Sequence, residues 1–95
     1  MPNSAQPTVQ TDNDKVRITE WRFAAGAATG YHRHEYDYVV VPVTTGILEM
    51  LGPDSNTTTA KLVAGQAYFR EAGVEHDVIN ANDSEFVFVE VEIKR

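Results

Sequence analysis

The chain has 95 residues, which is enough for one small domain with a single core and too few for two. It carries 8 basic and 14 acidic residues, a net charge of −6, without a cluster of Lys and Arg, so neither nucleic acid nor an anionic membrane is expected as a partner. The chain has no cysteine, which excludes disulfides, thiol nucleophiles and thiolate ligands and leaves nitrogen and oxygen to bind any metal.

The N-terminal segment, residues 1–14, is polar and contains Pro2 and Pro7, and we expect it to be flexible. It has neither the basic flank nor the apolar stretch of a secretory signal, so a cytoplasmic location is expected. No part of the chain approaches the roughly 20 consecutive apolar residues of a membrane-spanning helix. Residues 15–95 are expected to form the folded domain.

From residue 15 onward, short runs rich in β-branched and aromatic residues alternate with turn signals, and helical periodicity is absent. Pro42 cannot donate a ladder hydrogen bond, so it is expected to face a sheet edge or a bulge. Many short strands at this spacing predict a closed or nearly closed β-barrel. About eight strands are expected, at residues 15–23, 31–34, 38–43, 47–51, 57–63, 66–70, 76–80 and 85–94.

The last expected strand, residues 85–94, alternates strictly between two kinds of side chain. The face formed by its three valines and Ile93 is expected to be buried. Glu90 and Glu92, on the other face, are expected to point to solvent or to the mouth of the barrel.

The chain has three histidines, and their spacing predicts a metal site. His32 and His34 lie two residues apart in an extended segment, so both side chains point to the same face. His76 lies on a different expected strand and can approach the pair across a barrel. Three neutral imidazoles suit Fe, Mn, Ni, Zn, Co or Cu and leave further coordination positions for water or substrate.

Two spaced patterns contain all three histidines, and together they resemble the two motifs of the cupins. The resemblance covers more than half of the chain and implies an all-β, single-domain cupin-type β-barrel, also called a double-stranded β-helix or jelly roll. It further implies a divalent metal ion held inside the barrel by the three histidines. The residues that carry it are Gly26, His32, His34 and Gly46 in the first motif and Gly65, Gly73, His76 and Asn80 in the second.

Two positions depart from the cupin pattern. Glu71 stands where the second motif usually has proline, which alters only the rigidity of a turn. Val39 stands where, counting back from Gly46, the family usually has a glutamate ligand, and a valine cannot bind metal. Asp37 has the strand parity of Val39 and is a candidate fourth ligand, the alternative being an exposed turn aspartate.

Two functions remain open at this point. The resemblance is compatible with a metal-dependent oxygenase, isomerase or lyase that acts on a small organic molecule, with Asp37, Glu49 and Tyr38 as candidate acid or base groups. It is equally compatible with a non-catalytic module that binds or senses a small molecule or a metal. Tyr36 and Tyr38 either line the pocket or pack in the core. Because a small domain with exposed strand edges commonly pairs, a homodimer is expected.

Overall fold

The structure is a computed structural model that describes residues 3–95, and its regular secondary structure consists of strands apart from one short 3-10 turn. Within these residues it has no helix long and apolar enough to cross a membrane. The elements are β1 (Gln6–Asp12), β2 (Val16–Phe23), β3 (His32–Arg33), β4 (Asp37–Pro42), β5 (Gly46–Leu51), the 3-10 turn η1 (Pro53–Ser55), β6 (Thr57–Leu62), β7 (Tyr68–Arg70), β8 (Glu75–Asn80) and β9 (Phe86–Ile93).

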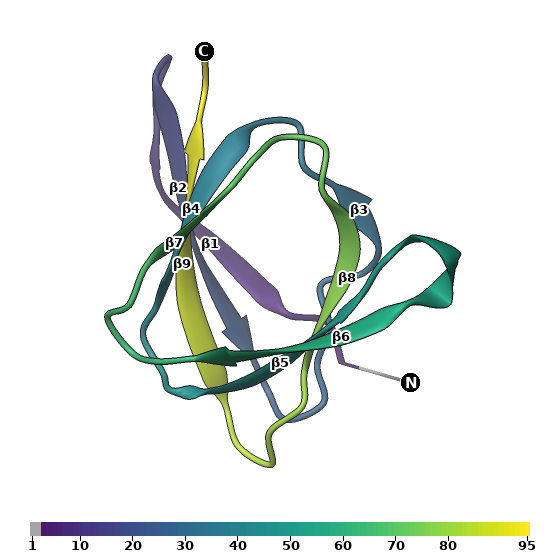
Figure 1. Cartoon of the computed structure of the whole chain (residues 1–95). Coiled ribbons are helices and arrows are strands. Elements are labelled where there is room, and N and C mark those ends of the chain that lie inside the picture. The colour runs from purple at the N-terminus through teal and green to yellow at the C-terminus, as the bar shows by residue number, and fades with distance from the viewer. Residues whose placement is uncertain (1–2) are drawn as a thin grey trace.

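The strands form two antiparallel sheets that enclose the core between them (Figure 1). The five-stranded sheet has the order β1-β2-β9-β4-β7, and the four-stranded sheet has the order β3-β8-β5-β6. The chain passes from one sheet to the other between β2 and β3, and again between β3 and β4. This arrangement confirms the expected all-β barrel and places the histidine-bearing strands β3 and β8 side by side.

The N-terminal segment differs from the expectation. Residues 1–14 were expected to be flexible, yet Gln6–Asp12 form β1, an edge strand paired with β2. All seven of its side chains are exposed, so the usual sign of a strand, one apolar face, is missing from the sequence. Backbone hydrogen bonds to β2 hold it instead. Residues 1 and 2 lie outside the described part of the chain.

Strand β9 corrects the expected burial. Its inward face carries Phe86, Phe88 and Glu90, which expose 0%, 4% and 9% of their surface. Of the valine face, Val87 is buried, but the side chains further along the strand are only half-buried on the outside of the sheet. Both faces of β9 contain apolar residues, so alternation alone could not show which one faces the core. The expectation of a buried valine face is therefore wrong beyond Val87. Glu90 does not point to solvent, because it is buried inside the barrel, where it and Glu92 line the cavity described below.

Asn80, the last residue of β8, closes one end of the barrel by tying three backbone segments together. It exposes 1% of its surface. The two hydrogens of its Nδ2 are shared among the carbonyl oxygens of Phe23, Ala24 and Ser84, at 3.3, 3.1 and 2.9 Å. Its Oδ1 accepts from the backbone N–H and the Nδ2 of Asn82 at 2.9 and 2.7 Å. The asparagine that ends the second motif thus has a structural role.

Replacing this asparagine should destabilise the barrel. Asn80→Ala leaves buried carbonyl oxygens without donors and opens a small cavity, so the free energy of unfolding should fall by about 2–4 kcal/mol. Urea denaturation measures the change. The control is Asn56→Ala, at an exposed turn position, which should shift the value by no more than about 0.5 kcal/mol. Equal effects of the two substitutions would contradict this role.

Candidate metal centre

The pairing of β3 with β8 brings two of the histidines together. In this antiparallel pair His32 lies directly opposite His76, so both side chains point to the same face. His34 follows two residues later with the same parity. Its backbone N–H donates to the Val74 carbonyl oxygen at 2.8 Å, and its carbonyl oxygen accepts from the Gly73 N–H at 2.8 Å. These two bonds hold His34 against the loop that leads into β8.

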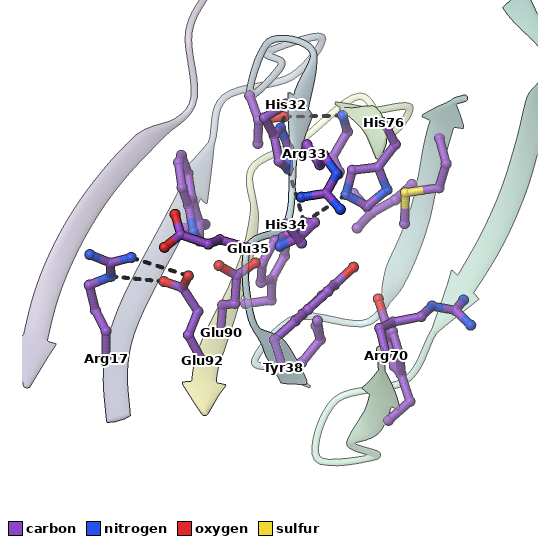
Figure 2. A pocket seen from close by; sticks show the side chains of 18 residues that line it. Arg17, His32, Arg33, His34, Glu35, Tyr38, Arg70, His76, Glu90 and Glu92 are labelled. Atoms are coloured by element: carbon purple, nitrogen blue, oxygen red, sulfur yellow. Dashed lines mark hydrogen bonds and ion pairs between the residues drawn. The ribbon is translucent and has the colours of Figure 1, made fainter. Parts of the chain in front are cut away.

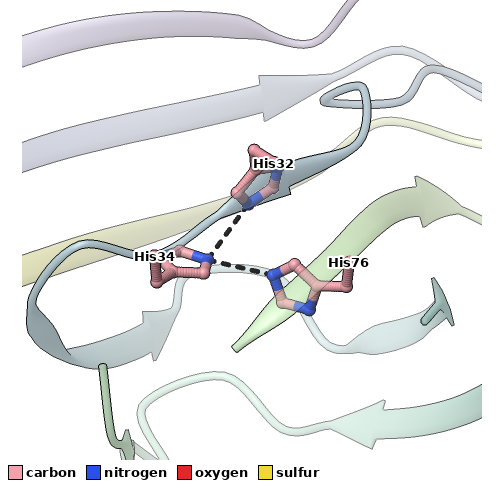
Figure 3. Close-up of side chains that lie close together, drawn as sticks. All are labelled: His32, His34 and His76. Carbon is pink, nitrogen blue, oxygen red and sulfur yellow. Dashed lines mark hydrogen bonds between the residues drawn. The ribbon is translucent and has the colours of Figure 1, made fainter. Parts of the chain in front are cut away.

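The three imidazole rings converge inside the barrel (Figure 3). The Nε2 atom of His34 lies 3.0 Å from the Nε2 of His32 and 3.0 Å from the Nε2 of His76. One ring nitrogen from each residue lies within 4.8 Å of those of the other two. The structure therefore brings all three predicted ligand residues together in a group that could hold a metal ion.

The contacts around the rings orient the donor nitrogens. The Nδ1 of His32 lies 2.8 Å from the Gly30 carbonyl oxygen, which can only accept, so Nδ1 carries the proton and Nε2 presents its lone pair to the group. The ring of His34 stacks on the ring of Tyr38, with a centroid separation of 3.8 Å and an interplanar angle of 15°. The hydrogen bond from His32 to the Gly30 carbonyl oxygen fixes the orientation of that ring, as such bonds do for histidine ligands in metal sites. The stack with Tyr38 restrains the ring of His34.

Burial keeps two of the imidazoles neutral at physiological pH. Burial, followed by the charges of His32 and His76, lowers the pKa of His34 to about 3. Burial, followed by the charges of His32 and Arg70, lowers the pKa of His76 to about 4. Because a metal binds the neutral form of imidazole, protons compete little for these two ligands at neutral pH.

The histidines lie among the residues that line a cavity of about 350 Å³, and Figure 2 shows its lining side chains. This volume falls in the range of small-molecule sites. Much of the remaining wall is apolar, and polar side chains of the five-stranded sheet lie among the apolar ones. The apolar side chains include Val40, Leu48, Met50, Val78 and Phe88, and the polar ones include Arg17, Tyr38, Tyr68, Arg70, Glu90 and Glu92.

Glu90 is the functional candidate that sequence reasoning missed. Burial, reinforced by the neighbouring charge of Glu92, raises its pKa to about 7, although the Trp21 indole and Arg17 act in the opposite direction. Glu92 itself is paired with Arg17 in a two-pronged ion pair at 2.9 and 3.3 Å. Glu90 can therefore hold or release a proton near neutral pH inside the cavity. The available signal was its parity with the aromatic residues Phe86 and Phe88.

The candidate fourth ligand, Asp37, lies outside the site. One of its oxygens accepts from the Arg95 guanidinium and the other from the Ala72 N–H, both at 2.8 Å. It shares the outward parity of Val39, whereas Tyr38 between them is buried and lines the cavity. In β4 the side chain of Tyr38 points inward and that of Val39 points outward. Counting back from Gly46 to find the ligand position therefore identified a residue on the outer face.

Of the other candidates, only Tyr38 lines the cavity. Glu49 lies between Leu48 and Met50, which face the cavity, so strand alternation turns its carboxyl away. Glu49 therefore has no acid or base role in this site. Tyr36 is half-buried and is not among the lining residues.

The two-sheet barrel and its three convergent histidines define a cupin with a site suited to metal. The chain belongs to the cupin domain family, whose pattern matches residues 19–92, and this confirms the resemblance seen in the sequence. It is 64% identical, over 90 residues, to the beta-alanine degradation protein BauB of Pseudomonas aeruginosa, covering 95% of this chain and 94% of that protein.

Solved structures agree with this assignment. A crystal structure of a cupin domain from Bordetella pertussis Tohama I superposes with a TM-score of 0.96 at 55% sequence identity, over 100% of this chain and 98% of that one. An uncharacterised protein with a double-stranded β-helix domain from Klebsiella pneumoniae has a TM-score of 0.78 at 20% identity, covering 96% of this chain and 77% of that one. The second likeness shows the shared fold alone.

The buried carboxyl of Glu90 should make metal-free protein less stable as pH rises. Its folded pKa of about 7 exceeds the ordinary value of 4.5, so the folded state binds more protons in this window and stability falls from about pH 4.5 to 7. A difference of this size corresponds to about 3 kcal/mol. Glu90→Gln should therefore gain about 3 kcal/mol over wild type between pH 4.5 and 8, measured by urea denaturation. Glu49→Gln is the control, and a Glu90→Gln profile parallel to wild type would refute the assignment.

Proposed function

We propose that this cupin is a metal-dependent enzyme that binds one divalent transition-metal ion through His32, His34 and His76 and acts on a small organic molecule in the barrel cavity. The observation that carries the proposal is the pair of 3.0 Å separations between the Nε2 atoms. Two nitrogens bound at about 2.1 Å, with an angle of about 90° at the ion, lie about 3.0 Å apart. The spacing therefore fits two ligands of one ion.

The chemistry of the donors supports the same conclusion. The Nε2 of His34 faces two other ring nitrogens, yet a ring nitrogen offers either one proton or one lone pair in its plane. It can therefore complete only one of the two contacts as a hydrogen bond. A cation at the meeting point of the three rings would satisfy all three lone pairs. Fe, Mn, Ni, Zn, Co and Cu all accept such nitrogen ligands.

The polar groups of the cavity favour a small molecule that carries a charge. Arg70 lines the cavity and lies close enough to His76 for its charge to lower that pKa, so it adds positive potential beside the ion. An ion with neutral imidazole ligands keeps its own charge, which favours an anionic group such as a carboxylate. Glu90 supplies the opposite charge when it is ionised. The name of the Pseudomonas aeruginosa relative, a beta-alanine degradation protein, suggests β-alanine or a molecule derived from it.

In this proposal each side chain has a separate part. An ion held by the three histidines would supply Lewis-acid or redox chemistry. Glu90 accepts or returns a proton, because its pKa of about 7 makes both forms available at neutral pH. The apolar wall excludes water and so strengthens the electrostatic interactions in the cavity. Tyr38 stacks against His34 and holds its ring in place.

Metal retention tests the ligand set. His76→Ala should reduce bound metal from about one ion per chain to a small fraction of that, measured by elemental analysis after dialysis against each metal. The matched control is Asp37→Ala, which removes the carboxylate paired with Arg95 and should leave the metal content at the wild-type value. Undiminished metal in His76→Ala, or loss of metal in Asp37→Ala, would refute the proposed site.

Substrate turnover tests the enzymatic role. Metal-loaded protein should convert at least one member of a panel of β-alanine, small oxo acids and hydroxy acids, followed by NMR and by oxygen uptake. Glu90→Gln should keep its metal and lose about 100-fold or more in turnover, as expected when a proton-transfer group is removed. Tight binding of a panel member without any conversion would instead favour a binding or sensing module.

A further inference from the structure

The outer face of the five-stranded sheet is apolar across four strands. The cross-strand register aligns Ile18, Val91, Val39 and Phe69 in one continuous row over β2, β9, β4 and β7. Beside this row, Val89 pairs with Val41. Phe69 is 50% exposed, and the others are half-buried.

Within residues 3–95, β9 has its main contacts with its two neighbours in the sheet, β2 and β4. The valine face of β9, which was expected in the core, lies on the outside of the sheet, so packing in the core does not explain why it is apolar. A face of this kind on a small domain usually marks an interaction site.

We propose that this outer sheet face is the interface of a homodimer, in which the five-stranded sheets of two copies pack against each other. The strands at its centre are already hydrogen-bonded on both sides, so another chain cannot add as a strand there. The face offers only side chains, and its complement is a second flat, apolar sheet about 10 Å away. Each copy of this chain presents such a sheet.

The charges around the face fit this occupant. Glu20 and Arg22 pair with each other at one end of the strands, and Asp37 pairs with Arg95 at the other end. In a dimer whose facing strands run antiparallel, the strand end with Glu20 and Arg22 lies over the partner's strand end with Asp37 and Arg95. Each end then meets both a positive and a negative charge. Arg22 also pairs with Glu85, so the charges at both ends of the face are partnered within each copy. The net charge of −6 belongs to the whole chain, and salt screens the repulsion between charges that lie more than about 10 Å apart.

The size of the face is also appropriate. Four strands about 4.8 Å apart and about six residues long cover a footprint of roughly 400 Å². A typical interface buries about 800 Å² on each partner, with an apolar centre and a polar rim. The apolar face supplies the centre. The charged residues at both strand ends and β1, exposed along its whole length, are available for the rim.

Sedimentation over a concentration series from the micromolar range upward tests the proposal. The wild type should have a mass of twice 10.6 kDa. Val91→Lys, at the centre of the face, should raise the dimer dissociation constant by about 100-fold or more, because it buries an unpaired charge. Phe69→Glu tests the same face at a position that is already half exposed, where the fold of each copy tolerates a charge.

The control is Val63→Lys. Val63 lies in the connection between β6 and β7, outside this face, and exposes 45% of its surface, so the substitution should leave the dimer intact. Circular dichroism and metal content show whether each variant keeps its fold. If Val91→Lys does not fold, Phe69→Glu decides. A monomeric wild type, a dimer unchanged in Phe69→Glu, or a dimer lost in Val63→Lys would overturn the proposal.

Discussion

The convergence of three imidazole nitrogens inside the barrel is the constraint on which the rest of the site depends. It arises from two simple features of β-structure: His32 stands opposite His76 in an antiparallel pair, and His34 has the same parity as His32. Closing the two sheets over one another buries the rings, and burial keeps two of them neutral. Three ring nitrogens this close together cannot all form hydrogen bonds with one another, but all three can bind one cation.

The two ends of the barrel interior differ, because one is tightly packed and the other contains the cavity. One end is closed by Phe23, Phe86 and the hydrogen-bonded side chain of Asn80, all of them fully buried. The other end holds the cavity, where Glu90 is buried among apolar side chains at a cost to stability. A purely structural core would have an apolar residue at that position. Retaining a carboxyl there fits the proposed role in proton transfer better than it fits packing.

The sequence was sufficient for the fold class and for the histidines, because motif spacing and strand alternation are local properties. The sequence was insufficient wherever its pattern fitted two different placements of a strand equally well. Strand β9 has apolar residues on both faces, so the position of Glu90 depended on which face met the opposite sheet. The position of Asp37 depended on the length of the turn before β4. Strand β1 is held by backbone pairing to β2 and has no apolar face to reveal it.

The inner face of the five-stranded sheet contributes polar side chains to the cavity, and we propose that its outer face forms the interface of a homodimer. Anomalous diffraction from metal-loaded crystals, at the absorption edge of the bound ion, tests whether the three histidines coordinate a metal. We expect one ion about 2.0–2.2 Å from the Nε2 atoms of His32, His34 and His76. An ion bound elsewhere, or held by fewer than these three nitrogens, would contradict it.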